Sequence, residues 1–259
     1  MRGLVLSLFP GADLLGMAFE EAGFCVVRGP DCMMGGDIRN FHAVPGKFDG
    51  VIGGPPCKSF SKACTGQVAT EGNLIPEFER VVLEAMPRWF CMENVEQAPM
   101  PFADRQPAVK VNGYLMQAHH YGAHQNRLRR FSTNLVLTPE TGLVPVSQRH
   151  PDPWPTVTAT ENKYCGGTTD RRRAGRKVGR QMTLAEVNVA MGLPENWETP
   201  CLLNEYKYAV RGNGVPLPLG RAVARCVVDA IDSRSLAARL RKTSMFPPPW
   251  GVNDLLVAA

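Results

Sequence analysis

Short apolar runs alternate with amphipathic helical patterns through the first half of this 259-residue chain. The apolar runs that we expect to form strands lie at residues 3–9, 24–27, 48–52 and 89–92. Between them, residues 14–22 and 75–86 carry apolar side chains at helical spacing, and Gly23 and Pro87 end the two patterns. Short apolar strands that alternate with helices form a largely parallel sheet with helices on both faces. The pattern therefore predicts a doubly wound α/β domain.

The second half of the chain has a different composition and fewer regular patterns. Residues 138–180 are rich in Pro, Thr, Gly and Arg, with only brief strand candidates such as residues 156–159. Helical patterns return at residues 184–191 and 219–231. The domains that we expect are a main domain at residues 1–131 and 181–259 and a small lobe at residues 132–180.

Positive charge is concentrated in one stretch of the chain. The net charge is +5, from 29 basic and 24 acidic residues. Residues 105–180 hold 13 of the basic and 4 of the acidic residues, so this stretch carries +9 and the remainder −4. Such a basic region suits contact with the phosphates of a nucleic acid, because each neutralised phosphate releases counterions. Charge alone fits a solvated basic loop equally well.

The cysteines indicate a reducing environment. Eight Cys are present without a C-x-x-C pair, and most lie in apolar strand-like or helical stretches of a chain without a secretory signal. We therefore expect free thiols and a cytoplasmic protein. The same spacing, with no partner set among the five His, argues against a metal site. No apolar run approaches the roughly 20 residues of a membrane helix.

Candidate functional residues follow the expected strands. In a parallel sheet, ligands bind beyond the carboxyl ends of the strands. There the chain has residues 9–11, residues 53–57, which end in Cys57, and residues 93–95, which begin with Glu93. A thiol presented by a stiff Gly-Gly-Pro-Pro turn is well placed as a nucleophile. Taken singly, each has a plainer interpretation: most loop cysteines are inert, and Glu93 fits a helix cap or a solvated turn.

Four short motifs occur in order along the chain. They are Pro-Pro-Cys-x-x-Phe-Ser at 55–61, Glu-Asn-Val at 93–95, Gln-Asn-Arg-Leu-Arg at 125–129 and Gly-Asn-Gly-Val-Pro at 212–216. Together they resemble the signature motifs of the cytosine-C5 methyltransferases, and the likeness extends from Ser7 to about Val228. The resemblance implies a Rossmann-like, S-adenosylmethionine-dependent methyltransferase sheet with a small target-recognition lobe.

The resemblance assigns catalytic roles. Cys57 is implied to be the nucleophile that adds to cytosine C6 and makes C5 reactive, while Glu93 holds the N3 and amino edge of the base. Arg127 and Arg129 lie at i and i+2 of one expected strand, so both can face the site. One of them is implied to contact cytosine O2 and the catalytic loop, and Gln125 to hold the strand end. Because C6 is inaccessible inside a duplex, the cytosine must be flipped out of the stack.

The resemblance also implies a site for S-adenosylmethionine. Its residues are Phe9, Pro10, Gly11, Asp37, Ile38, Pro55, Leu74, Asn213 and Val215. Asp37 is expected to accept a hydrogen bond from the exocyclic amine of adenine. The chain departs from the family pattern at two points. Family members commonly have Gly-x-Gly-Gly in the first loop, where Ala-Asp-Leu follows Gly11 here, and Asp31 stands near the usual place of a ribose-binding acid.

The implied nucleic-acid contacts fall in two segments. Residues 58–72 would close over the flipped base, and the short lobe at 132–180 would read the target. The expected contact residues are Lys58, Ser59, Ser61, Lys62, Lys163, Arg171, Arg172, Arg173, Arg176 and Lys177. The plainer alternative for residues 154–158 is that they form the core of the lobe.

We therefore expect a monomeric, metal-free enzyme of small bacterial or phage type that methylates cytosine C5 in double-stranded DNA through a covalent Cys57–C6 intermediate. Methylation of tRNA is the main alternative, since a tRNA-modifying branch shares these motifs. A catalytically idle DNA-binding protein is a third possibility, against which the intact Cys57, Glu93 and Arg127 argue. The chain lacks the G-x-G-x-x-G of dinucleotide-binding oxidoreductases and the H-x-E and P-C-x-x-C of zinc deaminases.

Overall fold

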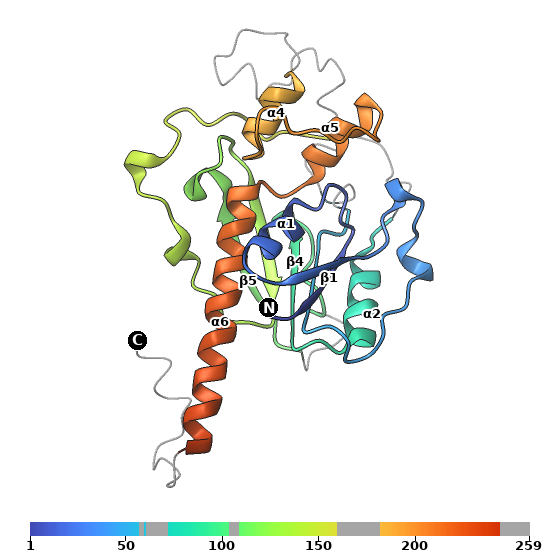
Figure 1. Ribbon diagram of the computed structural model, residues 1–259, viewed down its shortest axis with the longest axis vertical. Coiled ribbons are helices and arrows are strands. Elements are labelled where there is room, and N and C mark those ends of the chain that lie inside the picture. Colours follow the sequence, from blue (N-terminus) through green and yellow to red (C-terminus); the bar gives the residue numbers. More distant parts are fainter. Residues whose placement is uncertain (57–59, 61–71, 104–108, 160–181, 244–259) are drawn as a thin grey trace.

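A six-stranded sheet forms the centre of the molecule (Figure 1). The computed structural model describes residues 1–56, 60, 72–103, 109–159 and 182–243. The strands are β1 (Leu4–Leu8), β2 (Cys25–Arg28), β3 (Gly50–Gly53), β4 (Trp89–Asn94), β5 (Asn112–Gln117) and β6 (Leu128–Thr133). Their order in the sheet is β2-β1-β3-β4-β6-β5. The first four are parallel, whereas β6 runs antiparallel to both β4 and β5, so the prediction of a largely parallel sheet is confirmed.

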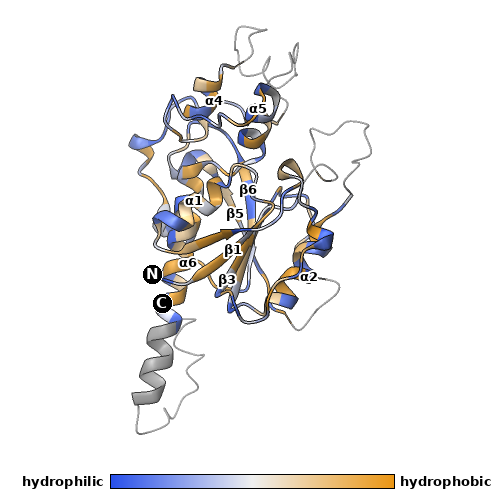
Figure 2. Cartoon of the chain, turned by 45° about the vertical axis from the view of Figure 1, so that its right-hand side comes forward, coloured by the Kyte–Doolittle hydropathy of each residue, from blue (hydrophilic) through white to orange (hydrophobic). Residues whose placement is uncertain are grey.

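Helices cover both faces of this sheet. α1 (Leu14–Glu21) and α6 (Leu217–Thr243) lie together on one face, and α2 (Ile75–Ala85) lies on the other (Figure 1). Neighbouring residues of a strand enter opposite cores: Ile52 packs in the cluster under α1 and α6, and Val51 in the cluster under α2. The central strands are accordingly hydrophobic along their length, whereas α2 has both kinds of residue (Figure 2).

Short 3₁₀ helices occur in the connections between these elements. They are η1 (Cys32–Met34), η2 (Ile38–Asn40), η3 (Ala118–Tyr121), η4 (Pro139–Gly142) and η5 (Val146–Gln148). η1 and η2 lie between β2 and β3, where the chain crosses from one strand to the next on the α2 side of the sheet.

The carboxyl-terminal helices extend beyond the predicted patterns. The pattern at 184–191 forms α4 (Leu184–Ala190), as expected, but α5 (Asn204–Asn213) was not predicted because its sequence carries few apolar residues. α6 is longer than the predicted 219–231, and its far end projects beyond the sheet (Figure 1). The sequence pattern marks only the part of α6 that packs against α1.

Residues 154–157 and α4 form a third core cluster with the start of α1. Val157 is 1% exposed and packs with Val187, Met191 and Leu14. Val157 is therefore part of a core, but its partners lie in α1 and in or just after α4, so the interpretation of residues 154–158 as the core of the lobe itself stays a prediction. The strand expected at 156–159 does not form, because the backbone groups of Val157 bond to side chains. The division of the chain at 132–180 stays a prediction.

Candidate active site

The carboxyl ends of β1, β3 and β4 meet at one edge of the sheet, because these strands are parallel neighbours. The loops after β3 and β4 are in contact there. Asn94 Nδ2 donates to the Pro55 carbonyl over 3.2 Å, and a Cβ on Gly54 would lie 2.9 Å from Glu93 Oε2. The structure thus brings residues 53–56 and 93–95 together, as the strand-end argument predicts. Cys57 follows directly in the chain but lies outside the described residues.

Glu93 forms an ion pair with Arg129 at this edge. Glu93 Oε1 lies 2.9 Å from Arg129 Nε, and both side chains are largely buried. The pair follows from strand register. Glu93 is opposite Phe131 in the antiparallel β4–β6 ladder, so Arg129 is its diagonal neighbour on the same face. The carboxylate predicted to hold the base therefore has a fixed orientation beside the loop that leads to Cys57.

Arg127 has a different environment from Arg129. It precedes β6, is 2% exposed, and donates from Nη1 to the Val157 carbonyl at 2.9 Å and from Nη2 to the Gly212 carbonyl at 3.0 Å. A side chain at Gly212 would collide with the backbone of Thr158, so these two segments are in close contact. Of the two arginines, Arg129 contacts the predicted site residue Glu93, whereas Arg127 donates to backbone carbonyls away from it. The catalytic roles of both stay predictions.

Gln125 is fully buried and connects β6 to the third core cluster. Its Nε2 donates to the Ala190 carbonyl at 2.8 Å and contacts Met191 Sδ at 3.0 Å, while its Oε1 accepts from Val157 N at 3.1 Å. The expected role, holding the strand end, agrees with these contacts. Gln125 and Arg127 together bind both backbone groups of Val157 and so attach this residue to the segment that leads into β6.

The first loop, between β1 and α1, has an unusual backbone. Phe9, Gly11 and Asp13 have φ angles of 55°, 53° and 53°, in the left-handed region that favours glycine. Asp13 caps α1 by accepting from Gly16 N at 3.1 Å, and its second oxygen lies 2.9 Å from Arg28 Nε. These contacts hold the loop in a conformation that its side chains do not favour intrinsically.

Two further carboxylates lie in the connection that follows β2. Asp31 accepts from Gly11 N and from Met33 N, both at 2.9 Å, and so joins this region to the first loop. Asp37 caps η2 by accepting from Arg39 N at 3.0 Å, and 46% of its side chain is exposed. Asp31 thus acts at least as a brace for the loop, and Asp37 keeps accessible oxygen atoms.

The remaining predicted cofactor residues come from α2, α5 and the start of α6. Leu74 precedes α2 and packs, like Phe9, against the second core cluster. Val215 is buried in the first cluster, and Asn213 is exposed at the end of α5. A Cβ on Gly214 would lie 3.2 Å from Leu14 Cδ1, so the last motif lies beside the start of α1, next to the first loop.

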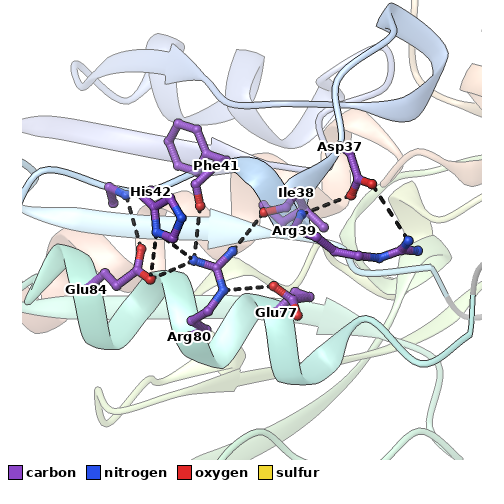
Figure 3. A network of polar contacts seen from close by, with 9 residues as sticks. Asp37, Ile38, Arg39, Phe41, His42, Glu77, Arg80 and Glu84 are labelled. Carbon is purple, nitrogen blue, oxygen red and sulfur yellow. Dashed lines mark hydrogen bonds and ion pairs between the residues drawn. The ribbon is translucent and has the colours of Figure 1, made fainter.

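Arg80 on α2 was not among the sequence-predicted site residues. Its guanidinium binds the backbone carbonyls of the segment that contains Asp37 and Ile38 (Figure 3). The local sequence signals only acidic neighbours at i−3 and i+4, which is typical of pairs within a helix. The contact across the connection between β2 and β3 could not be found from that spacing.

The described cysteines are free thiols. Burial, with the nearby charge of Glu93, raises the pKa of Cys91 to about 12, so this thiol stays protonated at neutral pH. Within the described residues, no cluster of three His, Cys, Asp or Glu side chains could hold a metal, and no helix is long and apolar enough to cross a membrane. Other predicted contacts lie outside the described part: Lys58, Ser59, Ser61, Lys62, Lys163, Arg171, Arg172, Arg173, Arg176 and Lys177.

Comparison with solved structures defines the class of fold. The chain aligns with the structure of a prophage-encoded DNA modification methyltransferase of E. coli, with a TM-score of 0.60 and 15% identity, over 88% of this chain and 99% of that one. The six-stranded mixed sheet is therefore the fold found in DNA methyltransferases.

Sequence comparisons then give the family. A family model described as C-5 cytosine-specific DNA methylase matches residues 30–136, which include the motifs around Cys57, Glu93 and Gln125. Type II methyltransferase M.AquIA of Picosynechococcus is 31% identical over 176 residues, 51% of this chain and 71% of that protein. M.FnuDI of Fusobacterium nucleatum is 33% identical, over 49% of this chain and only 45% of its own length. The chain belongs to the C-5 cytosine-specific DNA methylase family.

Proposed function

We propose that this protein transfers a methyl group from S-adenosylmethionine to C5 of a cytosine in double-stranded DNA. The observation that carries the proposal is the Glu93–Arg129 pair, fixed at the strand-end edge beside the loop that leads to Cys57. Family membership supports DNA as the substrate, because the matched family is named for cytosine-specific DNA methylation and the relatives are named type II methyltransferases. No observation on the described residues favours RNA.

The residues around the first loop fit S-adenosylmethionine. A Cβ on Gly11 would have no atom within 4 Å, so the loop is open on that side. Asp31 and Asp37 supply carboxylate oxygens for hydroxyl and amine donors, and these acids also suit a ligand that carries positive charge. Bound there, S-adenosylmethionine supplies an electrophilic methyl group.

The chemistry then assigned to the chain begins with Cys57. Its thiolate forms a bond to cytosine C6, and the electron pair of the 5,6 double bond moves toward C5 and the ring nitrogen. Glu93 binds the N3 and amino edge, which stabilises the charge that develops there. Arg129 holds the carboxyl group of Glu93 in place. C5 would then accept the methyl group, with S-adenosylhomocysteine as the leaving product. Loss of the C5 proton to water and cleavage of the sulfur–C6 bond would restore the double bond and the thiolate.

The same proposal requires the cytosine to leave the duplex, because C6 is stacked between neighbouring bases. The basic residues at 163–177 and the loop at 58–62 are proposed to meet the phosphates and the opened site. The target sequence read by the lobe is a separate property, and the proposed chemistry is the same for any target.

Mass spectrometry of nucleosides tests the proposal directly. Unmethylated duplex DNA and tRNA are each incubated with S-adenosylmethionine and the wild-type protein, Cys57→Ser or Cys201→Ser. We expect 5-methylcytosine from DNA with the wild type and with Cys201→Ser, whose exposed thiol serves as the matched control. Cys57→Ser should give no 5-methylcytosine, because a serine hydroxyl is not ionised at neutral pH. This variant should still bind DNA as the wild type does.

Three outcomes would contradict this assignment. Product from tRNA alone would transfer the proposal to RNA, and no product from either polymer would indicate an idle protein. Turnover by Cys57→Ser at the wild-type rate would remove Cys57 as the nucleophile.

A further inference from the structure

Within the connection between β2 and β3, residues 37–43 have only two backbone hydrogen bonds among themselves. In residues 37–43, the turn bonds are Asn40 N to the Asp37 carbonyl and Phe41 N to the Ile38 carbonyl, both at 3.1 Å. Ile38 and Ala43 anchor the two ends of this segment in the second core cluster. The backbone carbonyls between these anchors therefore need partners from outside the segment if the backbone that follows Asp37 is to be fixed.

Arg80 supplies such groups from α2. Its Nη2 donates to the Ile38 carbonyl at 2.8 Å, and its Nη1 donates to the Phe41 carbonyl at 3.0 Å (Figure 3). The planar guanidinium can bind two carbonyls at once because its N–H groups are fixed in one plane. The Arg80 side chain is 28% exposed, so these charged hydrogen bonds are only partly screened by water.

Two carboxylates of the same helix orient the guanidinium. Glu77 Oε2 accepts from Arg80 Nε at 2.8 Å, and Glu84 Oε1 accepts from Nη1 at 2.7 Å. Glu84 also accepts from Ala43 N at 3.3 Å and lies 3.1 Å from His42 Nδ1. Because Glu77 and Glu84 lie at i−3 and i+4, they hold Arg80 in place through α2 alone.

We infer that Arg80 is a positioning residue for the cofactor site: it fixes the segment that presents Asp37 and Ile38 to S-adenosylmethionine. The inference rests on the proposed function for the identity of this ligand. Arg80 acts on binding through the backbone, without touching the reacting atoms. Loss of its contacts should therefore weaken cofactor binding and leave the chemical step and DNA binding intact.

Calorimetric titration with S-adenosylmethionine, together with steady-state kinetics, tests this role in the full-length protein. For Arg80→Met, we expect the Kd and the KM for S-adenosylmethionine to rise by about tenfold, as the loss of charged hydrogen bonds predicts. The kcat at saturating S-adenosylmethionine and the KM for DNA should stay at their wild-type values. Arg80→Lys keeps the positive charge but loses the paired N–H groups of the guanidinium, so its Kd and KM should lie between those of the wild type and of Arg80→Met.

Arg88→Met is the matched control, because Arg88 lies just after the same helix and 87% of its side chain is exposed. Its binding constants should equal those of the wild type. If Arg80→Met does not fold, Glu84→Gln replaces it, since loss of one orienting carboxylate should shift the same two constants in the same direction. Amide hydrogen exchange at residues 38–43 should accelerate in either variant.

The outcomes separate this inference from the proposed function. A wild-type protein that binds no S-adenosylmethionine overturns the proposed function, and the assignment of Arg80 to that ligand with it. If the wild type binds and Arg80→Met binds equally well, only the inference is overturned. If the kcat of Arg80→Met at saturating S-adenosylmethionine falls by as large a factor as its Kd rises, a role confined to positioning is likewise overturned.

Discussion

Asp13 occupies a place in the first loop where family members commonly have glycine. Its φ of 53° explains how the exchange is possible, because Asp is among the few residues that tolerate the left-handed region. The side chain is 4% exposed, accepts from Ser7 Oγ at 2.7 Å, and pairs with Arg28. The departure seen in the sequence therefore keeps the backbone turn and adds a buried carboxylate that braces it.

The ionisation of Asp13 should make stability depend on pH. Burial raises the pKa of this carboxyl above its usual 3.8, and the Ser7 hydrogen bond and the Arg28 charge only partly oppose the effect. The folded protein therefore favours the protonated form of Asp13. The stability that this preference contributes is fully present below pH 3.8 and is lost as the pH rises through the raised pKa of the folded protein. Asparagine keeps the cap but does not titrate, so the stability of Asp13→Asn should improve relative to the wild type as the pH rises.

Urea unfolding of both proteins, from below pH 3.8 to neutral pH, measures this difference. Asp232→Asn is the control, because Asp232 is an exposed partner of Arg2. The control curve should run parallel to that of the wild type. A parallel curve for Asp13→Asn as well would rule out the titration of Asp13 as a source of pH dependence.

At the scale of elements, α4 and α5 depend on Arg211. This arginine is fully buried at the end of α5, where Nε donates to Asn188 Oδ1 at 2.6 Å and the terminal nitrogens donate to the carbonyls of Lys207 and Trp197. It also lies over the Trp197 ring, 4.6 Å from its centroid. α5 has few apolar residues, so these polar contacts explain how it is held without a large hydrophobic face.

Removal of Arg211 should therefore destabilise the protein strongly. Arg211→Met keeps the bulk of the side chain but leaves several buried acceptors without their donor, which should lower the free energy of unfolding by roughly 3 kcal/mol. The control Arg221→Met removes a surface ion pair with Glu21 and should cost at most about 1 kcal/mol. Urea unfolding measures both; equal losses would show that the Arg211 contacts add nothing beyond a surface pair.

At the scale of the whole molecule, charge is divided between the two parts of the chain. The stretch 105–180 carries +9 and the remainder −4, so attraction to DNA phosphates should come from one region. Replacement of Arg171, Arg172 and Arg173 by Ala should weaken DNA binding and flatten its dependence on salt, with the slope of log K against log salt falling by about 0.9 per lost phosphate contact.

Binding titrations over a range of salt concentrations measure this slope. The control variant replaces Arg2, Arg88 and Arg234 by Ala. Arg2 and Arg88 precede β1 and β4, at the edge opposite the strand-end site, and Arg234 bonds to Asn134, which contacts Arg88. The control should keep the wild-type slope. An unchanged slope for the 171–173 variant would mean that this cluster does not meet phosphate.

The alternation of strands and helices could be read from the sequence, because burial on one or both faces leaves a local pattern of apolar residues. Four strands and α1, α2 and α4 were found in this way. The motifs around Cys57 and Glu93 were also visible, since each is a few consecutive residues at or just after the end of a strand. α5 was missed because a helix that is held by a buried arginine leaves no apolar pattern in the sequence.

The sequence by itself determined the class of fold, the family and the identity of the candidate nucleophile and base-binding acid. Only the tertiary structure decided that Arg129 pairs with Glu93 while Arg127 binds Val157 and Gly212. It alone showed that Arg80 holds a segment 39 to 42 residues earlier in the chain. The reason is physical: such contacts depend on strand register and on the path of connections, and neither is encoded in the spacing of neighbouring residues.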